Sequence, residues 1–366
     1  MILYTIIMRY LNALNKIDGL GAKKLKMLMN FFGTAEKIWN APQTELEKSG
    51  IGEATAQKVV DQRPNINPDA EWAKVEKEKV KIVSIQDGDY PLLLKQIPDS
   101  PYLLYMKGNL ECLKLPMVAV VGSRKLTEYG SRVARIFSRD IAKNGICVVS
   151  GLAFGIDAAA HRGALDAKGK TIAVVGNSLD EESMYPRSNF QLMEEILESG
   201  GLLISEFPIK TQAANWTFPA RNRIMAGMSM GTLVVEAAEK SGSLITANLA
   251  LDYNREVFAV PGPIFSPQSV GTHQLIKAGA KLASCSADIL EELKLEKISE
   301  EPVEINEAEL SEEEKNILRV LSHESVYIDR ISKLAKLETM IVSATLSILE
   351  IKGLVKNIGG QNYIKM

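Results

Sequence analysis

An anion-binding group of residues follows the apolar run 117–121. Gly122, Ser123 and Arg124 stand between this run and a helix expected to begin near Thr127. Glycine lets backbone N–H groups approach an anion at a helix N-terminus, serine adds a hydroxyl donor, and arginine adds a planar charged fork. The segment is neither Gly-x-Gly-x-x-Gly nor an ATP-binding loop with a Lys-Ser/Thr pair. It therefore predicts a phosphate site and gives little support to dinucleotide or ATP binding.

The segment 218–223 offers a second set of chemical groups. Phe218 can stack on a base, and Arg221 and Arg223 can clamp phosphates. Asn222 can donate to and accept from a base edge. An aromatic side chain beside cations supplies the two elements of a single-strand site.

Acidic residues elsewhere in the sequence could pair with both arginines of this segment. Arg221 and Arg223 could pair with Glu206 and Glu236 and so lock the loop. The two interpretations are compatible, because a phosphate clamp needs supporting contacts.

Helix starts after other apolar runs add hydroxyl groups and a histidine. Ser241, Gly242 and Ser243 open a helix and form a further anion cradle. Asp157 could cap the helix that follows the run 146–151, and His161 lies in the first turns of that helix. Because neither a nucleophile nor a metal-ligand set accompanies this histidine, a packed structural role is favoured over catalysis.

The helix after the first anion cradle carries a basic stripe. Arg132, Arg135, Arg139 and Lys143 recur three or four residues apart and so share one face. Between residues 119 and 145, six basic residues stand against two acidic ones. A solvated helix face and a DNA track explain this stripe equally well.

Six short aliphatic runs determine the expected fold class. They occupy residues 117–122, 146–151, 171–176, 201–206, 232–237 and 256–262. Continuous apolar runs of this length are typical of parallel strands that helices cover on both faces. The sequence therefore predicts an α/β fold with a doubly wound parallel sheet, whose ligands lie beyond the carboxyl ends of the strands.

The flanking segments predict further domains. The expected parts are an all-α segment at 1–66, the α/β core at 67–290, a charged linker at 291–308 and a winged helix at 309–366. Glycine turns at 17–21 and 49–52 indicate a helix-hairpin-helix doublet resembling SAM-like domains, which either binds phosphate or merely turns the chain.

The winged helix is expected to differ from a sequence-reading one. Its predicted recognition helix, 339–351, contains no Lys or Arg, whereas a major-groove reader places basic or amide side chains there. A protein-contact or packing role is therefore favoured for this segment.

Composition excludes several other classes of protein. The net charge of −2 means that any affinity for nucleic acid must come from local basic groups. Cys112, Cys147 and Cys285 have no metal-ligand spacing and are expected to be buried, reduced thiols. The apolar N-terminal run is too short for a membrane span and makes a poor signal peptide, so a cytosolic protein is expected. The motifs and the cysteine spacing predict neither a cofactor nor a metal.

Long stretches of the core resemble the DprA/Smf DNA-processing family. They are DYPLLLKQIPDSPYLLYMKGN (89–109), VAVVGSRKLTEYG (118–130), VVSGLAFGIDAAAHRGAL (148–165), TIAVVGNSLDEESMYPRSNFQL (171–192), LLISEFP (202–208), FPARNRIMAG (218–227), TLVVEAAEKSGSLITANLAL (232–251), REVFAVPGPI and GTHQLIKAGA. The resemblance runs without a break from about residue 85 to 290.

This resemblance implies an extended Rossmann-like fold that binds single-stranded DNA, dimerises and loads the RecA recombinase during natural transformation. It assigns a set of residues to the DNA pocket: Gly122, Ser123, Arg124, Lys210, Phe218, Arg221, Asn222, Arg223, Ser241, Gly242 and Ser243. It assigns His273 and Ile276, within the segment 268–285, to the dimer interface, although small and apolar residues there could equally form core.

Two alternative functions stay open at this point. The stretch 227–242 is loosely similar to the Gly-Thr-x-x-Glu motif of phosphoribohydrolases, with Glu236 as the candidate for N-glycosidic cleavage, but the preceding Pro-Gly-Gly of that family is absent. The other alternative is a duplex-binding accessory factor that uses the helical segment, with the core serving only for oligomerisation.

Overall fold

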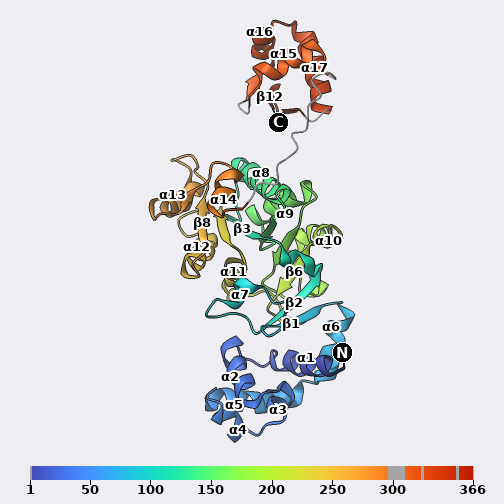
Figure 1. Ribbon diagram of the computed structural model, residues 1–366, viewed down its shortest axis with the longest axis vertical. Coiled ribbons are helices and arrows are strands. Elements are labelled where there is room, and N and C mark those ends of the chain that lie inside the picture. Colours follow the sequence, from blue (N-terminus) through green and yellow to red (C-terminus); the bar gives the residue numbers. More distant parts are fainter. Residues whose placement is uncertain (1, 296–309, 323–324, 352–353, 366) are drawn as a thin grey trace. The chain divides into compact units, whose positions relative to one another are not determined.

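The computed structural model describes residues 2–295, 310–322, 325–351 and 354–365 (Figure 1). The chain divides into two compact units, Met1–Ile298 and Ser299–Met366. Each unit has a hydrophobic cluster of its own. The predicted linker 291–308 begins at the end of α14 (Ser286–Glu292), and its residues 296–308 lie outside the described part of the chain.

The first unit opens with a helical segment. Its helices are α1 (Ile2–Leu14), α2 (Ala22–Phe32), α3 (Ala35–Asn40), α4 (Gln43–Lys48), α5 (Glu53–Gln62), η1 (Arg63–Asn65) and α6 (Pro68–Lys77). α2 and α5 begin directly after the predicted glycine turns, with Gly21 and Gly52 as N-caps. Gly19 and Gly52 have φ values of 80° and 83°, which favour glycine, so these turns need that residue type.

The helical segment shares a hydrophobic cluster with the sheet. Buried side chains of α1 pack in the same cluster as Tyr105 and Ala173 of the strands. The Tyr105 hydroxyl donates to Asn12 Oδ1 at 2.8 Å, and Asn15 Nδ2 donates to that hydroxyl at 3.2 Å. A domain boundary at residue 66 stays a prediction.

A nine-stranded sheet forms the centre of the first unit. Its strands are β1 (Lys81–Ser84), β2 (Leu103–Gly108), β3 (Met117–Val121), β4 (Cys147–Ser150), β5 (Thr171–Val174), β6 (Leu202–Ser205), β7 (Gly231–Val234), β8 (Glu256–Ala259) and β9 (Lys281–Leu282), in the order β1-β2-β6-β5-β4-β3-β7-β8-β9. β3 to β9 are parallel to one another, β2 pairs antiparallel with β6, and β1 pairs antiparallel with β2. The six predicted strands are confirmed.

Helices cover both faces of this sheet. They are α7 (Leu92–Lys95), α8 (Glu128–Lys143), α9 (Ile156–Asp166), α10 (Phe190–Glu198), α11 (Thr217–Met228), α12 (Gly242–Asp252) and α13 (Val270–Lys277), with 3-10 turns η2 (Leu110–Lys114), η3 (Glu181–Ser183), η4 (Arg187–Asn189) and η5 (Pro267–Ser269). In β3, Val118 and Val120 pack in the cluster that contains α8 and α9. Ala119 and Val121 pack in the cluster that contains α11 and α12. A strand buried on both faces needs the unbroken apolar run seen in the sequence.

The strand order changes direction at β3. From β3 the chain proceeds outward through β4 and β5 to β6, then returns to place β7 on the other side of β3. The helices after β3 and β7 therefore leave toward opposite faces of the sheet. In such sheets this switch point opens a crevice at the carboxyl ends of the two strands.

The cysteines and the start of α9 differ in part from the expectations. Cys112 and Cys147 are buried as predicted, but the prediction for Cys285 is wrong, because it lies exposed at the start of α14. Gly155, not Asp157, is the N-cap of α9.

His161 is fully buried, as a structural histidine would be. The Thr171 hydroxyl donates to Val148 O, so it accepts from His161 Nδ1 at 2.7 Å. Burial lowers the pKa of His161 to about 3. This imidazole therefore remains neutral at ordinary pH.

The second unit has the order expected of a winged helix. Its elements are α15 (Glu312–Val320), β10 (Val326–Tyr327), α16 (Ile328–Ala335), α17 (Thr339–Ile351), β11 (Val355–Asn357) and β12 (Asn362–Lys365), with strand order β10-β12-β11. Ser311 and Glu314 form a capping box at the start of α15. α17 exposes Met340, Ile341 and Ile348, so its accessible face carries apolar side chains.

The described residues offer neither a membrane span nor a metal cluster. No helix among them has the length and apolar character needed to cross a membrane. No group of three or more His, Cys, Asp or Glu side chains in the described ranges could hold a metal ion.

Candidate nucleic-acid interface

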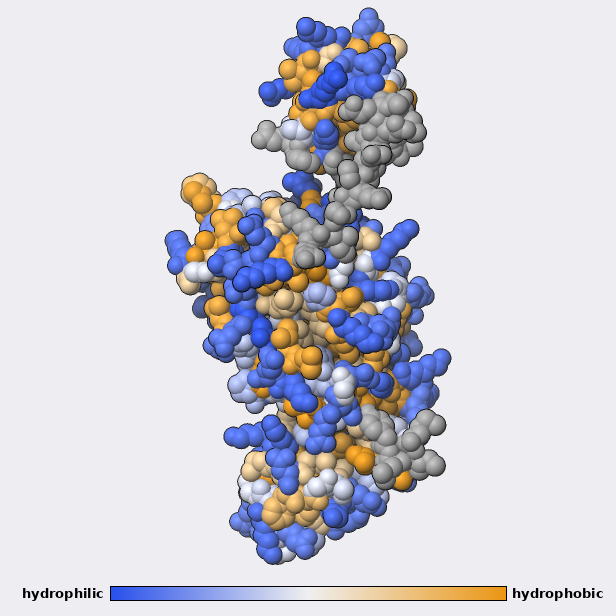
Figure 2. All heavy atoms as spheres, viewed as in Figure 1, coloured by the Kyte–Doolittle hydropathy of each residue, from blue (hydrophilic) through white to orange (hydrophobic). Residues whose placement is uncertain are grey.

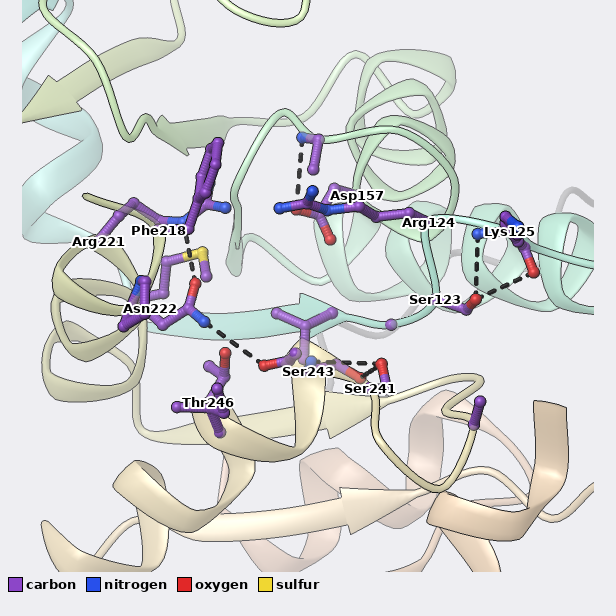
Figure 3. A pocket seen from close by; sticks show the side chains of 18 of the residues that line it. Ser123, Arg124, Lys125, Asp157, Phe218, Arg221, Asn222, Ser241, Ser243 and Thr246 are labelled. Carbon is purple, nitrogen blue, oxygen red and sulfur yellow. Dashed lines mark hydrogen bonds between the residues drawn. The ribbon is translucent and has the colours of Figure 1, made fainter. Parts of the chain in front are cut away.

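A pocket of about 470 Å³ lies at the switch point between β3 and β7 (Figure 3). Its wall after β3 is Gly122 to Lys125, and its opposite walls come from α11 and from the start of α12. The pocket therefore lies beyond the carboxyl ends of the strands, where α/β sheets bind ligands.

Close packing fixes the loop after β3. A Cβ added to Gly122 would lie 2.6 Å from Ile156 Cγ1, so only glycine fits. Ser123 N donates to Glu236 O at 2.7 Å, and Ser123 Oγ donates to Lys125 O at 3.0 Å. The serine hydroxyl thus holds the loop, contrary to the expectation that it would point at an anion.

Arg124 is one of two exposed cations of this loop, the other being Lys125. Its guanidinium carbon lies 4.8 Å from the centre of the Phe218 ring. Within the described ranges it has no ion-pair partner. A guanidinium held over an aromatic ring remains free to bind a phosphate along its edge.

Phe218 extends an aromatic surface beside Arg124. Its ring centre lies 6.0 Å from that of Tyr185, which is 46% exposed. Tyr185 was not predicted from the sequence, although a tyrosine in a loop after an apolar run is a recognisable signal. These rings provide the stacking surface that a base requires.

Arg221 is buried beneath the pocket. Its Nη1 donates to Val174 O at 2.8 Å and also to Gly151 O, and its Nε donates to Asn222 Oδ1 at 3.0 Å. Burial lowers the pKa of Arg221 and raises the pKa of the nearby Asp157 carboxyl, and each charge opposes the shift of the other.

This position changes the roles expected of two residues. Arg221 supports the pocket from below, and the amide oxygen of Asn222 is already engaged with it. Asn222 Nδ2 points toward Gly242 O at 3.5 Å, so its amide joins α11 to α12. Both residues line the pocket, but the guanidinium of Arg221 and the amide of Asn222 are engaged in hydrogen bonds within the protein.

Arg223 and Lys210 lie outside this pocket. Arg223 Nη2 contacts both oxygens of Glu206, at 2.5 and 2.6 Å, so the predicted locking pair is present for this arginine. Lys210 Nζ lies 3.5 Å from Glu182 Oε2, and its backbone N–H donates to Asp180. Neither side chain is among those that line the pocket.

The N-terminus of α12 forms the other wall. Ser241 is the N-cap, and its hydroxyl accepts from Ser243 N at 3.4 Å. Both serines and Gly242 line the pocket, as do Asn215 and Gln268, neither of which was predicted from the sequence. The start of an 11-residue helix adds the positive end of its dipole to this wall.

The basic stripe on α8 does not contribute to the pocket. Arg135 pairs with Asp166, and Arg139 pairs with Asp140 at 3.0 Å. None of the four basic side chains lines the pocket. The geometry favours a solvated helix face for this stripe.

Glu236 acts within the fold. It is 3% exposed, and its two carboxylate oxygens accept from Thr127 N at 2.9 Å and Thr127 Oγ1 at 2.5 Å. It therefore pairs with the start of α8, and neither with Arg221 nor with Arg223. Because it does not line the pocket, the suggested role in N-glycosidic cleavage has no geometric support.

His273 and Ile276 lie on α13, near the β9 edge of the sheet. Both are partly exposed. His273 Nε2 lies 3.0 Å from Gly262 O, and Ile276 packs at the margin of the hydrophobic cluster.

Comparisons with known proteins identify the family. Residues 81–294 match the family model of DNA recombination-mediator protein A, and residues 300–361 match the DprA winged helix domain. The chain belongs to the DprA/Smf family. This is a family of DNA-processing recombination mediators, and the match confirms the resemblance and the winged helix seen in the sequence.

Individual members of the family agree with this assignment. Protein Smf of Synechocystis is 36% identical over 97% of this chain and 98% of its own length. DNA processing protein DprA of Streptococcus pneumoniae is 40% identical over 70% of this chain and 99% of its own. Its crystal structure has a TM-score of 0.68 over 78% of this chain and 97% of that one.

A second solved structure bears on the ligand of the family. DNA processing protein A of Helicobacter pylori is 30% identical, with a TM-score of 0.53 over 59% of this chain and 97% of that one. A single-stranded DNA binding mode is described for the Helicobacter protein.

Proposed function

We propose that this protein binds single-stranded DNA in the pocket at the β3–β7 switch point and that it mediates recombination through this binding. The observation that carries the proposal is the position of Arg124, exposed and unpaired in the described ranges, over the ring of Phe218. A phosphate on the guanidinium and a base on the adjoining rings use both groups at once. The binding mode described for the Helicobacter relative supports the same ligand.

The chemistry of the pocket favours a strand over a small ligand or a duplex. Stacking on the rings of Phe218 and Tyr185 needs unstacked bases, which a duplex hides. The α12 N-terminus and Arg124 lie on opposite walls, so successive phosphates of one strand can reach both.

The test is a competition for a fluorescently labelled single strand, followed by the anisotropy of the label. We expect unlabelled single strand to displace the label at about tenfold lower concentration than duplex. Affinity should fall with salt by a slope of about 0.7 per phosphate bound. Equal competition by duplex, or by a mononucleotide, would contradict the proposal.

We further propose that the protein works as a homodimer in the cytosol and loads RecA onto the bound strand. Apolar side chains are exposed around α13, namely Ile264, Phe265, Val270 and Leu282, and Figure 2 shows hydrophobic side chains over this end of the unit. An exposed apolar patch of this kind is typical of a protein contact. His273 and Ile276 adjoin it, which supports their proposed place in the dimer interface.

Charge introduced into this patch should separate the dimer. The first variant, Phe265→Glu, changes a side chain that is 92% exposed and leaves the core intact. The second variant, Ile276→Glu, tests the interface residue that was proposed from the sequence. Sedimentation should show half the wild-type mass, and RecA assembly on protein-coated strands should slow. The control Phe31→Glu, at an exposed position on α2, should change neither. An unaltered mass for both α13-side variants would rule out this interface.

A further inference from the structure

A second cleft lies within the first unit, between the first glycine turn and the sheet. It encloses about 620 Å³, a volume in the usual range for ligand sites. One wall consists of Gly19, Gly21 and three lysines of α2, and the other includes the loop 98–100 and Arg223. Figure 2 shows hydrophilic side chains over α2, where the helical segment meets the sheet.

The charge in this cleft is mainly positive. Lys23 and Lys26 are exposed, and neither has an ion-pair partner within the described ranges. Lys24 Nζ donates to Thr55 Oγ1 at 2.6 Å. Asp99 is the acid of the opposite wall, but it already accepts from the Tyr253 hydroxyl at 2.8 Å and lies 3.7 Å from Arg223 Nε. The two exposed lysines of the cleft are therefore free to bind an anion from outside the described part of the chain.

The form of the cleft restricts that anion. Glycine turns that bind duplex DNA must protrude into it, whereas this turn faces the loop 98–100 across the cleft. A cleft with walls on two sides admits a single phosphodiester backbone more readily than a duplex. We propose that the cleft lined by Lys23 and Lys26 is a second binding site for the backbone of single-stranded DNA, an inference that rests on the proposed function.

One helix joins the two sites. Arg221 and Asn222 of α11 line the first pocket, and Arg223 of the same helix lines the cleft. The sites therefore lie on different sides of α11, and a strand must pass around this helix to reach both. A short oligonucleotide can fill only the first site, but a longer strand can reach both.

The experiment compares oligonucleotide lengths in the full-length protein carrying Lys23→Glu and Lys26→Glu. We expect binding of an oligo-dT of about six nucleotides to stay within about twofold of wild type. Binding of about thirty nucleotides should weaken roughly tenfold. Its salt slope should fall by about 1.4, because two phosphates of the strand no longer meet a lysine.

The matched control is Lys37→Glu with Lys48→Glu. It changes the net charge by the same amount within the same helical segment, but neither lysine lines the cleft. This control should bind both lengths like wild type. An unchanged affinity of the cleft variant for the long strand, an equal loss for both lengths, or an equal loss in the control would overturn the second site. Failure of the first site would show differently, as loss of preference for single strand over duplex in the wild-type protein.

Discussion

Replacing Arg124 by alanine should weaken single-strand binding by about 10- to 100-fold at moderate salt. A hydrogen bond to a charged group contributes about 1.5–3 kcal/mol, and about 1.4 kcal/mol corresponds to a tenfold change in affinity. The side chain is exposed and makes no ion pair in the described ranges, so its removal should leave the fold unchanged. Titrations at several salt concentrations should also show a slope lower by about 0.7, because one phosphate fewer is neutralised.

Two further variants separate the role of this guanidinium from that of charge in general. Arg132→Ala removes the same charge from α8, at an exposed position outside the pocket, and should bind nearly as well as wild type. Arg124→Lys keeps the charge without the planar fork and should recover part of the affinity. Equal weakening by Arg124→Ala and Arg132→Ala would mean that the pocket has no special part in binding.

The sequence was sufficient to predict the sheet and the place of the pocket, for a physical reason. A parallel strand buried on both faces must be apolar at successive positions, as Val118 to Val121 are, and few other structures require this. Because ligands bind where such strands end, the residues after β3 and at the start of α12 could be expected from the sequence to line a pocket, as they do. The helices expected near Thr127 and Ser241 do begin there, with these two residues as their N-caps.

The direction of individual side chains could not be predicted in this way. Arg221 and Arg223 are two residues apart, so on α11 they point to opposite sides, by about 200° of helical rotation. One lies under the pocket and the other pairs with Glu206, although both are arginines beside the same phenylalanine. The cleft under Lys23 depends on packing between the helical segment and the sheet, and no local pattern in the sequence specifies that packing.

Replacing Arg221 by methionine should destabilise the first unit by about 3–5 kcal/mol. The change leaves the buried Asp157 carboxylate without the larger of the two positive charges, Arg221 and Arg124, that oppose its desolvation, and removing one member of a buried charge pair typically costs this much. It also leaves Gly151 O and Val174 O without their donor. Urea unfolding followed by tryptophan fluorescence measures this unit alone, because Trp39, Trp72 and Trp216 all lie within it.

A second substitution and a pH series identify the cause of that destabilisation. Adding Asp157→Asn to Arg221→Met removes the unpaired charge, so the double variant should be less destabilised than the sum of the single ones, with a coupling of about 0.5–3 kcal/mol. In Arg221→Met, burial raises the pKa of Asp157 with less opposition, so the folded state keeps the proton to higher pH than the unfolded chain does. Stability of this variant relative to wild type should therefore be greatest near pH 4 and decline toward pH 7. A destabilisation that is independent of pH and strictly additive with Asp157→Asn would assign the effect to lost packing, and not to the unpaired charge of the Asp157 carboxylate beneath the pocket.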